Sequence, residues 1–404
     1  MLDITAFIEE NLKRTIHRNT EDNGTLLGLP FPYTVPCADD SFLEMYYWDT
    51  YFTNLGLISI GNIELAKNNI DNMLWLVEKY GFMPNGNRTY YLNRSQPPFL
   101  CFGVKDIFSV THDKDWLLYA YEVLCKEYNF WQTRRLAPNG LNFYGNYLGL
   151  DDEKIEALYK DYIKRCGTKE IENVSKTQVA HTILTFVESG WDCCSRFEAD
   201  GENFNPIDLN ALLYGFEVQM SEFSSILENG NKDKWIALAE KRKMLMDELL
   251  WNDEYKIYCD YNFRTNKLSK VISAASLYPA YVGFTEKQGE TGKLVNSLIL
   301  KYGISCSINS KYVNGYQWDY PNVWAPIQYI AYKACDNCGL NVLASEIREK
   351  YINLIDTSYK NTGNLWEKYN GITGETACQE YDAPTMMGWT AGVYLYFKHL
   401  DDKV

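Results

Sequence analysis

The chain has few of the residues that mark metal centres, nucleic-acid surfaces and membrane spans. It contains only four histidines in 404 residues, and they show no metal-ligand spacing, which argues against a zinc or iron site. Lysine and arginine total 39 against 53 aspartates and glutamates, so the formal net charge is -14. Without a basic stripe, nucleic acids and anionic membranes are poor partners. No apolar run reaches transmembrane length, and no P-loop or nucleophile elbow occurs.

The N-terminal segment and the cysteines predict a cytoplasmic protein. Apolar residues recur at helical spacing from Ile4 to Ile16 with acidic residues between them, which indicates an amphipathic helix rather than a signal peptide. The eleven cysteines are scattered, and we expect reduced, mostly buried thiols. Cys335 and Cys338 fall at a helix-helix turn and are interpreted as incidental, not as a zinc or redox pair. Nothing in the sequence selects an oligomeric state.

Helical periodicity dominates and predicts an all-α protein, taken here as one domain over residues 1–404. About a dozen helices favour a closed toroid of inner and outer helices, because long aromatic loops must then share one face. An open helical solenoid is the alternative. A minor β-hairpin is expected between 255–261 and 267–271. The helices are expected at 4–18, 47–60, 62–79, 97–110, 113–134, 153–165, 176–187, 208–228, 232–250, 273–282, 286–300, 323–335, 338–356 and 385–400.

Three segments set a carboxylate beside large aromatic rings. They are SGWDCCSRF (189–197), YQWDYPNVWAP (316–326) and LWEKY (365–369). Rings cover the apolar faces of a sugar, while carboxylates accept its hydroxyl hydrogens or move protons. Asp192 and Glu367 are therefore candidates for the acid and base of glycoside hydrolysis.

Each carboxylate also has a plainer interpretation. Asp192 and Asp319 could cap the helices that follow them, and for Asp192 alone capping is the better explanation. Glu367 could be a solvated charge paired with the next lysine, and Asp49 could be bonded to backbone. Four carboxylates set against aromatic residues in separate loops nevertheless favour a carbohydrate site. Enclosure by Trp191 would raise the pKa of Asp192, as a general acid requires.

Longer motifs carry a family resemblance and run in family order from about residue 30 to 395. They are YYWDTYF (46–52), PNGNRTYYLNRSQPP (84–98), ESGWDCCSRF (188–197), PIDLNA (206–211), QWDYPNVWAP (317–326), EKY (367–369), EY (380–381) and GW (388–389). In these motifs the chain resembles the α,α-trehalase family of inverting glycoside hydrolases.

The resemblance implies an (α/α)6 barrel with the site at one mouth. It implies Asp192 as general acid and Glu367 as general base, and no metal or organic cofactor. The implied partner is a small carbohydrate, with trehalose as the leading substrate. The implied substrate contacts are Phe42, Tyr46, Trp48, Asp49, Asn85, Arg94, Gln96, Gly190, Trp318 and Glu380.

Three departures from the family pattern concern the leaving sugar. Ser41 stands where a substrate-binding arginine is expected, and no Arg-Pro-Glu-Ser segment lies between the NRSQPP and SGWD motifs. The lid before the final EY is shortened to TGETACQEY (373–381). Tyr144 and Tyr147 are candidates for a replacement wall. We expect a looser choice of aglycone, with another disaccharide or a glucosylglycerate-like compound as the alternative substrate, and a non-catalytic sugar-binding protein as a third hypothesis.

Overall fold

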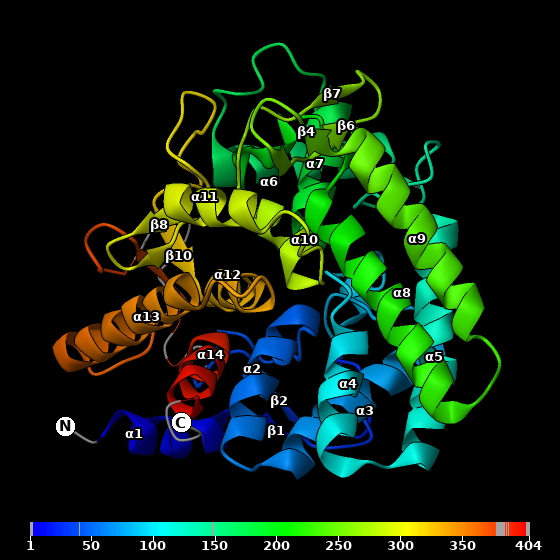
Figure 1. The fold of residues 1–404 in the computed structure, drawn as a ribbon, viewed down its shortest axis with the longest axis vertical. Helices are drawn as coiled ribbons and strands as arrows, with labels where there is room; N and C mark the ends of the chain where they lie inside the picture. The colour runs from blue at the N-terminus through cyan, green and yellow to red at the C-terminus, as the bar shows by residue number, and fades with distance from the viewer. Residues whose placement is uncertain are drawn as a thin grey trace.

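A computed structural model describes residues 3–39, 41–147, 149–376, 384, 386 and 388–400. The chain is mainly helical, and its helices form a ring (Figure 1). The all-α prediction is confirmed, and a helix is found at each position where one was expected. The α-helices of the described residues are α1 (Ile4–Leu12), α2 (Tyr47–Ser59), α3 (Ile63–Tyr80), α4 (Leu100–Thr111), α5 (Lys114–Arg134), α6 (Asp152–Cys166), α7 (Lys176–Ser189), α8 (Ile207–Leu227), α9 (Lys232–Leu249), α10 (Tyr278–Tyr281), α11 (Gln288–Leu298), α12 (Ala325–Asn337), α13 (Asn341–Thr362) and α14 (Gly388–His399).

The ring has an inner and an outer layer, which confirms the toroid over the solenoid. Helices α2, α4, α8, α10, α12 and α14 pack on one another in that order, and α14 returns to α2. Helices α1, α3, α5, α9, α11 and α13 each pack on at least one of these inner helices. Helices α6 and α7 form an additional pair between α5 and α8 in the chain. Among the described residues, none of the helices is both long and apolar enough to cross a bilayer.

Two glycines let the first and last inner helices close the ring. A Cβ atom on Gly56 of α2 would lie 2.6 Å from the Cα atom of Gly392 in α14. Cβ atoms do not approach other atoms that closely, so larger side chains would push the helices apart. This close crossing of the barrel therefore joins segments more than 300 residues apart in sequence.

Several inner helices begin in the aromatic loops. Trp48 lies in the first turn of α2, Trp324 immediately precedes α12, and Trp389 lies in the first turn of α14. Pro326 is tolerated at the start of α12 because the first amides of a helix have no intrahelical partner. The N-terminal ends of these helices thus carry the rings of the aromatic motifs to one mouth of the barrel.

The β structure is more divided than the single hairpin expected. The predicted strand 255–261 splits, because Ile257 and Tyr258 pair back with the preceding strand and only Tyr261 pairs onward with Leu268. The small sheets pair β1 (Ile16–His17) with β2 (Tyr33–Thr34), β4 (Trp251–Asn252) with β5 (Ile257–Tyr258), β8 (Ile299–Leu300) with β9 (Gly303–Ile304), β10 (Asn322–Trp324) with β11 (Lys368–Asn370), and β6 (Tyr261–Asn262) with both β3 (Phe204–Asn205) and β7 (Lys267–Leu268).

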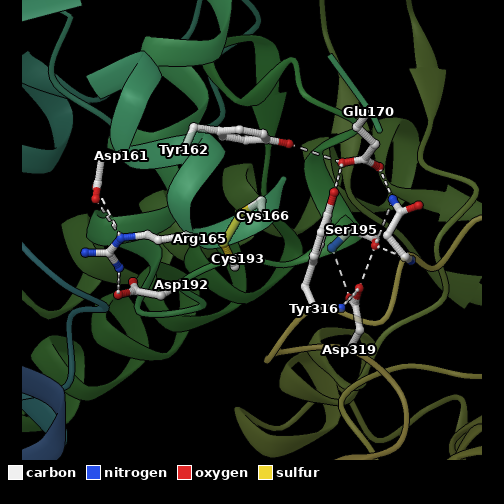
Figure 2. The surroundings of a disulfide bond; sticks show 11 residues. Asp161, Tyr162, Arg165, Cys166, Glu170, Asp192, Cys193, Ser195, Tyr316 and Asp319 are labelled. Atoms are coloured by element: carbon white, nitrogen blue, oxygen red, sulfur yellow. Dashed lines mark hydrogen bonds and ion pairs between the residues drawn. A yellow bond between two sulfur atoms is a disulfide. The ribbon is translucent and has the colours of Figure 1, made fainter. Parts of the chain in front are cut away.

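One pair of cysteines departs from the expected reduced thiols. Cys166, the last residue of α6, forms a disulfide with Cys193, whose Cα atom is 6.1 Å away (Figure 2). The expectation that all cysteines are free is therefore wrong for this pair. The sequence could not show it, because 27 residues separate the two cysteines and only the packing of α6 on α7 brings them together. Cys335 and Cys338 are free and lie where α12 ends and α13 follows.

Candidate active site

The aromatic loops enclose a cavity of about 460 Å³. This volume lies in the range of about 300–1,000 Å³ that is usual for small-molecule sites. Of the residues expected to contact substrate or act in catalysis, all but Glu380 line it; Glu380 lies outside the described residues. The cavity is lined by Pro36, Phe42, Tyr46, Trp48, Asp49, Asn85, Tyr91, Arg94, Gln96, Asp161, Lys164, Arg165, Val187, Gly190, Asp192, Gln317, Trp318, Trp324, Glu367 and Trp389.

Tryptophan rings form a continuous aromatic surface beside this cavity. Trp318 stacks on Trp324 with ring centroids 4.0 Å apart. The Trp318 ring also contacts Trp48 at 5.6 Å and Trp191 at 5.2 Å, and Trp389 packs edge-on against Trp324 at 5.6 Å. Each ring fixes its neighbour, so this surface is preorganised for the apolar face of a sugar.

Gly190 allows the acid loop to approach this surface. It ends α7 with φ of +71°, a conformation that glycine adopts at no steric cost. A Cβ atom at this position would lie 2.7 Å from Cε2 of Trp48. The glycine is therefore required both by the backbone and by the tryptophan that lies against it.

Buried ion pairs fix the loop that carries Asp192. Arg196 donates hydrogen bonds to both carboxylate oxygens of Asp208, at 2.8 and 3.0 Å, and also bonds Asp260. Its guanidinium lies 4.5 Å from the ring centroid of Trp191. These fully buried charges are satisfied by one another, so they serve as scaffold rather than as reacting groups.

Asp192 is a partly exposed cavity residue and not a helix cap. The short helix that follows has Cys194 at its N-terminal boundary and no side-chain cap. The Asp192 carboxylate instead accepts a hydrogen bond of 3.3 Å from Nη1 of Arg165. Burial in the cavity wall raises the pKa of Asp192, while the guanidinium groups of Arg165 and Arg94 oppose that rise.

Glu367 enters the same cavity from the loop before β11. It is buried, with 3% of the residue exposed, and Nζ of Lys368 lies 3.6 Å from its Oε2. Lys368 also donates a hydrogen bond of 2.7 Å to Oε1 of Gln317, which anchors this loop to the QWD segment. The backbone oxygen of Glu367 accepts a hydrogen bond from the Trp389 indole at 3.2 Å. The solvated-charge interpretation is therefore wrong.

Asp49 is the third carboxylate of the cavity. It lies in the first turn of α2 and is 8% exposed. Burial raises its pKa to about 8, and the negative charges of Glu367 and Asp192 add to the rise. At neutral pH this side chain is mainly protonated, so it can donate a hydrogen bond as well as accept one.

Polar groups on the other wall are held by the backbone around them. The Gln96 carbonyl accepts a hydrogen bond from the backbone nitrogen of Trp48, and the Asn85 amide donates to the backbone oxygen of Val187. The Arg94 guanidinium lies 4.8 Å from the ring centroid of Tyr91. Its buried Nε has no hydrogen-bond partner among the described residues, and this leaves it available to a ligand oxygen.

Asp319 does not belong to this site, although the sequence grouped it with the other carboxylates. It is fully buried and accepts hydrogen bonds from the backbone nitrogen and hydroxyl of Ser195, at 3.0 and 2.6 Å, and from the backbone nitrogen of Tyr316. Nor does it cap α12, which begins at Ala325. Asp319 joins the QWD loop to the acid loop.

The replacement wall expected from Tyr144 and Tyr147 is absent from the described cavity lining. Tyr144 is buried, and the Tyr147 hydroxyl bonds Thr185. Ser41 is exposed and lies outside the lining too.

Helix α6 contributes lining residues that the sequence did not reveal. These are Asp161, Lys164 and Arg165 near its C-terminal end. The available signal was a cysteine next to Arg165 and another next to Asp192, but their pairing required the fold. Among the described residues, histidine, cysteine and carboxylate side chains form no group that could hold a metal ion.

Comparisons with known proteins agree with this site. The Trehalase family model matches residues 3–400. The periplasmic trehalase of Xanthomonas campestris pv. campestris (strain B100) is 34% identical over 95% of this chain and 70% of its own length. That of Xanthomonas axonopodis pv. citri (strain 306) is 34% identical over 94% and 69%.

Solved structures show the same fold. Neutral trehalase Nth1 from Saccharomyces cerevisiae has a TM-score of 0.77 at 24% identity, over 92% of this chain and 74% of that one. A GH63 mannosylglycerate hydrolase from Thermus thermophilus has a TM-score of 0.67 at 15% identity, over 98% and 100%. The (α/α)6 architecture is thus confirmed. With the family model and the curated relatives matching nearly its whole length, the chain belongs to the trehalase family of glycoside hydrolases.

Proposed function

We propose that this protein hydrolyses a small α-linked glucoside with inversion, that α,α-trehalose is its leading substrate, and that Asp192 is the general acid and Glu367 the general base. The observation that carries the proposal is the placement of both carboxylates in the wall of one aromatic cavity. The pKa of Asp49, raised first by burial and then by both of these charges, agrees with that placement. Paired carboxylates are what glycoside hydrolysis needs.

The roles follow from the bonds that change. Asp192 gives its proton to the glycosidic oxygen as the bond from that oxygen to C1 breaks. Glu367 takes a proton from a water molecule whose oxygen bonds to C1 from the opposite face. One sugar leaves with a new hydroxyl group, and the other carries the inverted configuration at C1. Inversion requires carboxyl groups roughly 6.5–9.5 Å apart, and we predict this separation here.

The acid also divides the cavity into two sides. Because Asp192 protonates the leaving oxygen, the side chains beside it face the leaving group. Asn85, Gln96 and Asp49 are then the polar groups for the glucose that is attacked, over the tryptophan rings. This arrangement would bind one pyranose tightly and leave the choice of aglycone to the Asp192 side.

A second candidate substrate is a glucoside with a different aglycone, such as another disaccharide or a glucosylglycerate-like compound. The observation that favours it is the composition of the leaving-group side, where Ser41 is exposed and outside the lining. Lys164 and Arg165 of α6 stand there instead, and their positive charges suit a carboxylate-bearing aglycone.

Asp192→Asn and Glu367→Gln test the roles. Each variant should lose about 10²–10⁴-fold in kcat on trehalose, because the amide can neither donate nor accept the catalytic proton. Substrate affinity and melting temperature should change little. Glu375→Gln is the matched control, since Glu375 is exposed close to Glu367 in the chain and does not line the cavity. Near-normal turnover by either active-site variant would contradict the assignment.

A panel of α-linked disaccharides and glucosyl-polyols, including a glucosylglycerate, ranks the substrates by glucose release. The proposal predicts the highest kcat/KM for trehalose. A better substrate with another aglycone would select the second candidate. Binding of the sugars without release of glucose would select the non-catalytic sugar-binding protein.

Cytoplasmic localisation stays a proposal. Scattered buried thiols support it, whereas a disulfide is more frequent in oxidising compartments. Fractionation of the source cells, followed by detection of the protein, would decide between them.

A further inference from the structure

The C-terminal end of α6 is attached to the acid loop at two adjacent positions. Arg165 bonds the Asp192 carboxylate at 3.3 Å, and the next residue, Cys166, forms the disulfide with Cys193, which follows Asp192 (Figure 2). The same guanidinium also bonds Asp161, one helical turn earlier, with 3.1 Å between Nε and Oδ1. Arg165 is thus held between two carboxylates, and only one of them is the acid.

A second set of bonds fixes this end of the helix from the other side. Glu170, shortly after α6, accepts hydrogen bonds from Tyr162 at 3.4 Å and Tyr316 at 3.2 Å, and it also contacts Asn314. Asn314 bonds the hydroxyl of Ser195 through its backbone nitrogen at 2.9 Å. Figure 2 shows this network on the opposite side of the disulfide from Arg165. The end of α6 therefore has little freedom to move relative to the acid loop.

We propose that Arg165 is a positioning residue that orients the Asp192 carboxyl and supplies the positive charge facing it, and that the Cys166 to Cys193 disulfide keeps it in place. The proposal rests on the proposed function, in which Asp192 is the general acid. The family pattern does not predict it, because the chain lacks the expected arginine at position 41 and the Arg-Pro-Glu-Ser segment.

The charge matters because the cavity otherwise disfavours ionised Asp192. Burial and the nearby carboxylates act in that direction, and an acid that holds its proton too tightly transfers it poorly. Arg165 acts against them, together with Arg94. The charged groups that face or line the cavity with Asp192 are Arg165, Lys164 and Asp161 of α6, Arg94 of the NRSQPP segment, Asp49 of α2 and Glu367 before β11.

The test is the pH dependence of kcat/KM on trehalose. A general acid must be protonated, so activity falls above its pKa, and loss of the facing cation raises that pKa. In Arg165→Ala the basic limb should therefore move to higher pH by about one unit or more. Arg165→Lys should restore most of the wild-type position. The matched control is Lys160→Ala, because Lys160 lies on α6, has a side chain that is 71% exposed and pairs with Glu156 at the surface.

The disulfide is tested with a double variant, Cys166→Ser with Cys193→Ser. Its basic limb should move in the same direction as that of Arg165→Ala. Hydrolysis of α-glucosyl fluoride, whose leaving group needs little help from an acid, should remain within about threefold of wild type in all these variants and so shows that folding and Glu367 are intact.

An Arg165→Ala profile that superimposes on wild type, or moves to lower pH, would overturn the role of Arg165. A wild-type profile in the double cysteine variant would overturn the role of the disulfide. Failure of the proposed function is distinguishable from both, because Asp192→Asn would then keep its activity on trehalose.

Discussion

Asp49→Asn should make the protein more stable at alkaline pH, because the wild-type cavity holds a carboxyl group that resists ionisation. Burial and two neighbouring carboxylates raise the pKa of Asp49 from the ordinary 3.8 to about 8. Between these values the folded protein keeps the proton and the unfolded chain does not. Unfolding then releases a proton, and the stability that this group contributes below pH 4 is lost as the pH rises to 8.

The size of the effect follows from the width of that window. Each pKa unit corresponds to about 1.4 kcal/mol, so the free energy of unfolding of the wild type should fall by about 4 kcal/mol between pH 5 and pH 8 through Asp49 alone. Asparagine does not ionise and is nearly the same size, so the variant lacks this fall. Its activity should drop at the same time, since Asp49 lines the substrate cavity.

Urea unfolding of both proteins at several pH values measures the difference. Other titrating groups cancel in the comparison, and Asp233→Asn, an exposed change on α9, is the control. The gap between Asp49→Asn and wild type should widen steadily from pH 5 to pH 8. A gap that stays constant across this range would refute the reasoning, because it would mean that Asp49 titrates alike in the folded and unfolded chains.

Three further predictions concern backbone and covalent features. Gly190→Ala should raise KM several-fold and lower the melting temperature, since its methyl group meets Trp48 in a left-handed backbone conformation; unchanged kinetics would count against this fit. Gly56→Ala should cost about 1–3 kcal/mol by separating α2 from α14, measured by urea unfolding, and a neutral result would show that the ring closure is loose. Loss of the disulfide should lower stability by roughly 3 kcal/mol, because it closes a segment of 27 residues; calorimetry of the double serine variant under non-reducing conditions is the check, and a melting temperature equal to wild type would contradict it.

The helices could be predicted from the sequence because local pattern decides them. Apolar periodicity, with breaks such as Gly81 and Gly363, places α3 and α13 close to their observed ends. Asp113 caps α5 as expected, accepting a hydrogen bond of 3.0 Å from the backbone nitrogen of Trp116. The hairpin was wrong because alternation in 255–261 does not specify which strand is the partner.

The site was predictable where its residues lie in motifs and unpredictable where it depends on packing. Trp48 and Asp49, next to each other in a motif, both line the cavity. Asp319 has the same local sequence as Asp192, a carboxylate after tryptophan, yet only the fold turns it away toward Ser195. The contribution of Arg165 has no motif at all, since it requires α6 to pack beside the acid loop.

Inversion by Asp192 and Glu367 can be read from the configuration of the first products. Proton NMR of trehalose hydrolysis, recorded before the sugars mutarotate, resolves α- and β-glucose. Inversion predicts equal amounts of the two anomers, because the attacked glucose is released as β and the leaving glucose keeps its α configuration. Release of α-glucose alone would show retention and would contradict the roles assigned to both carboxylates.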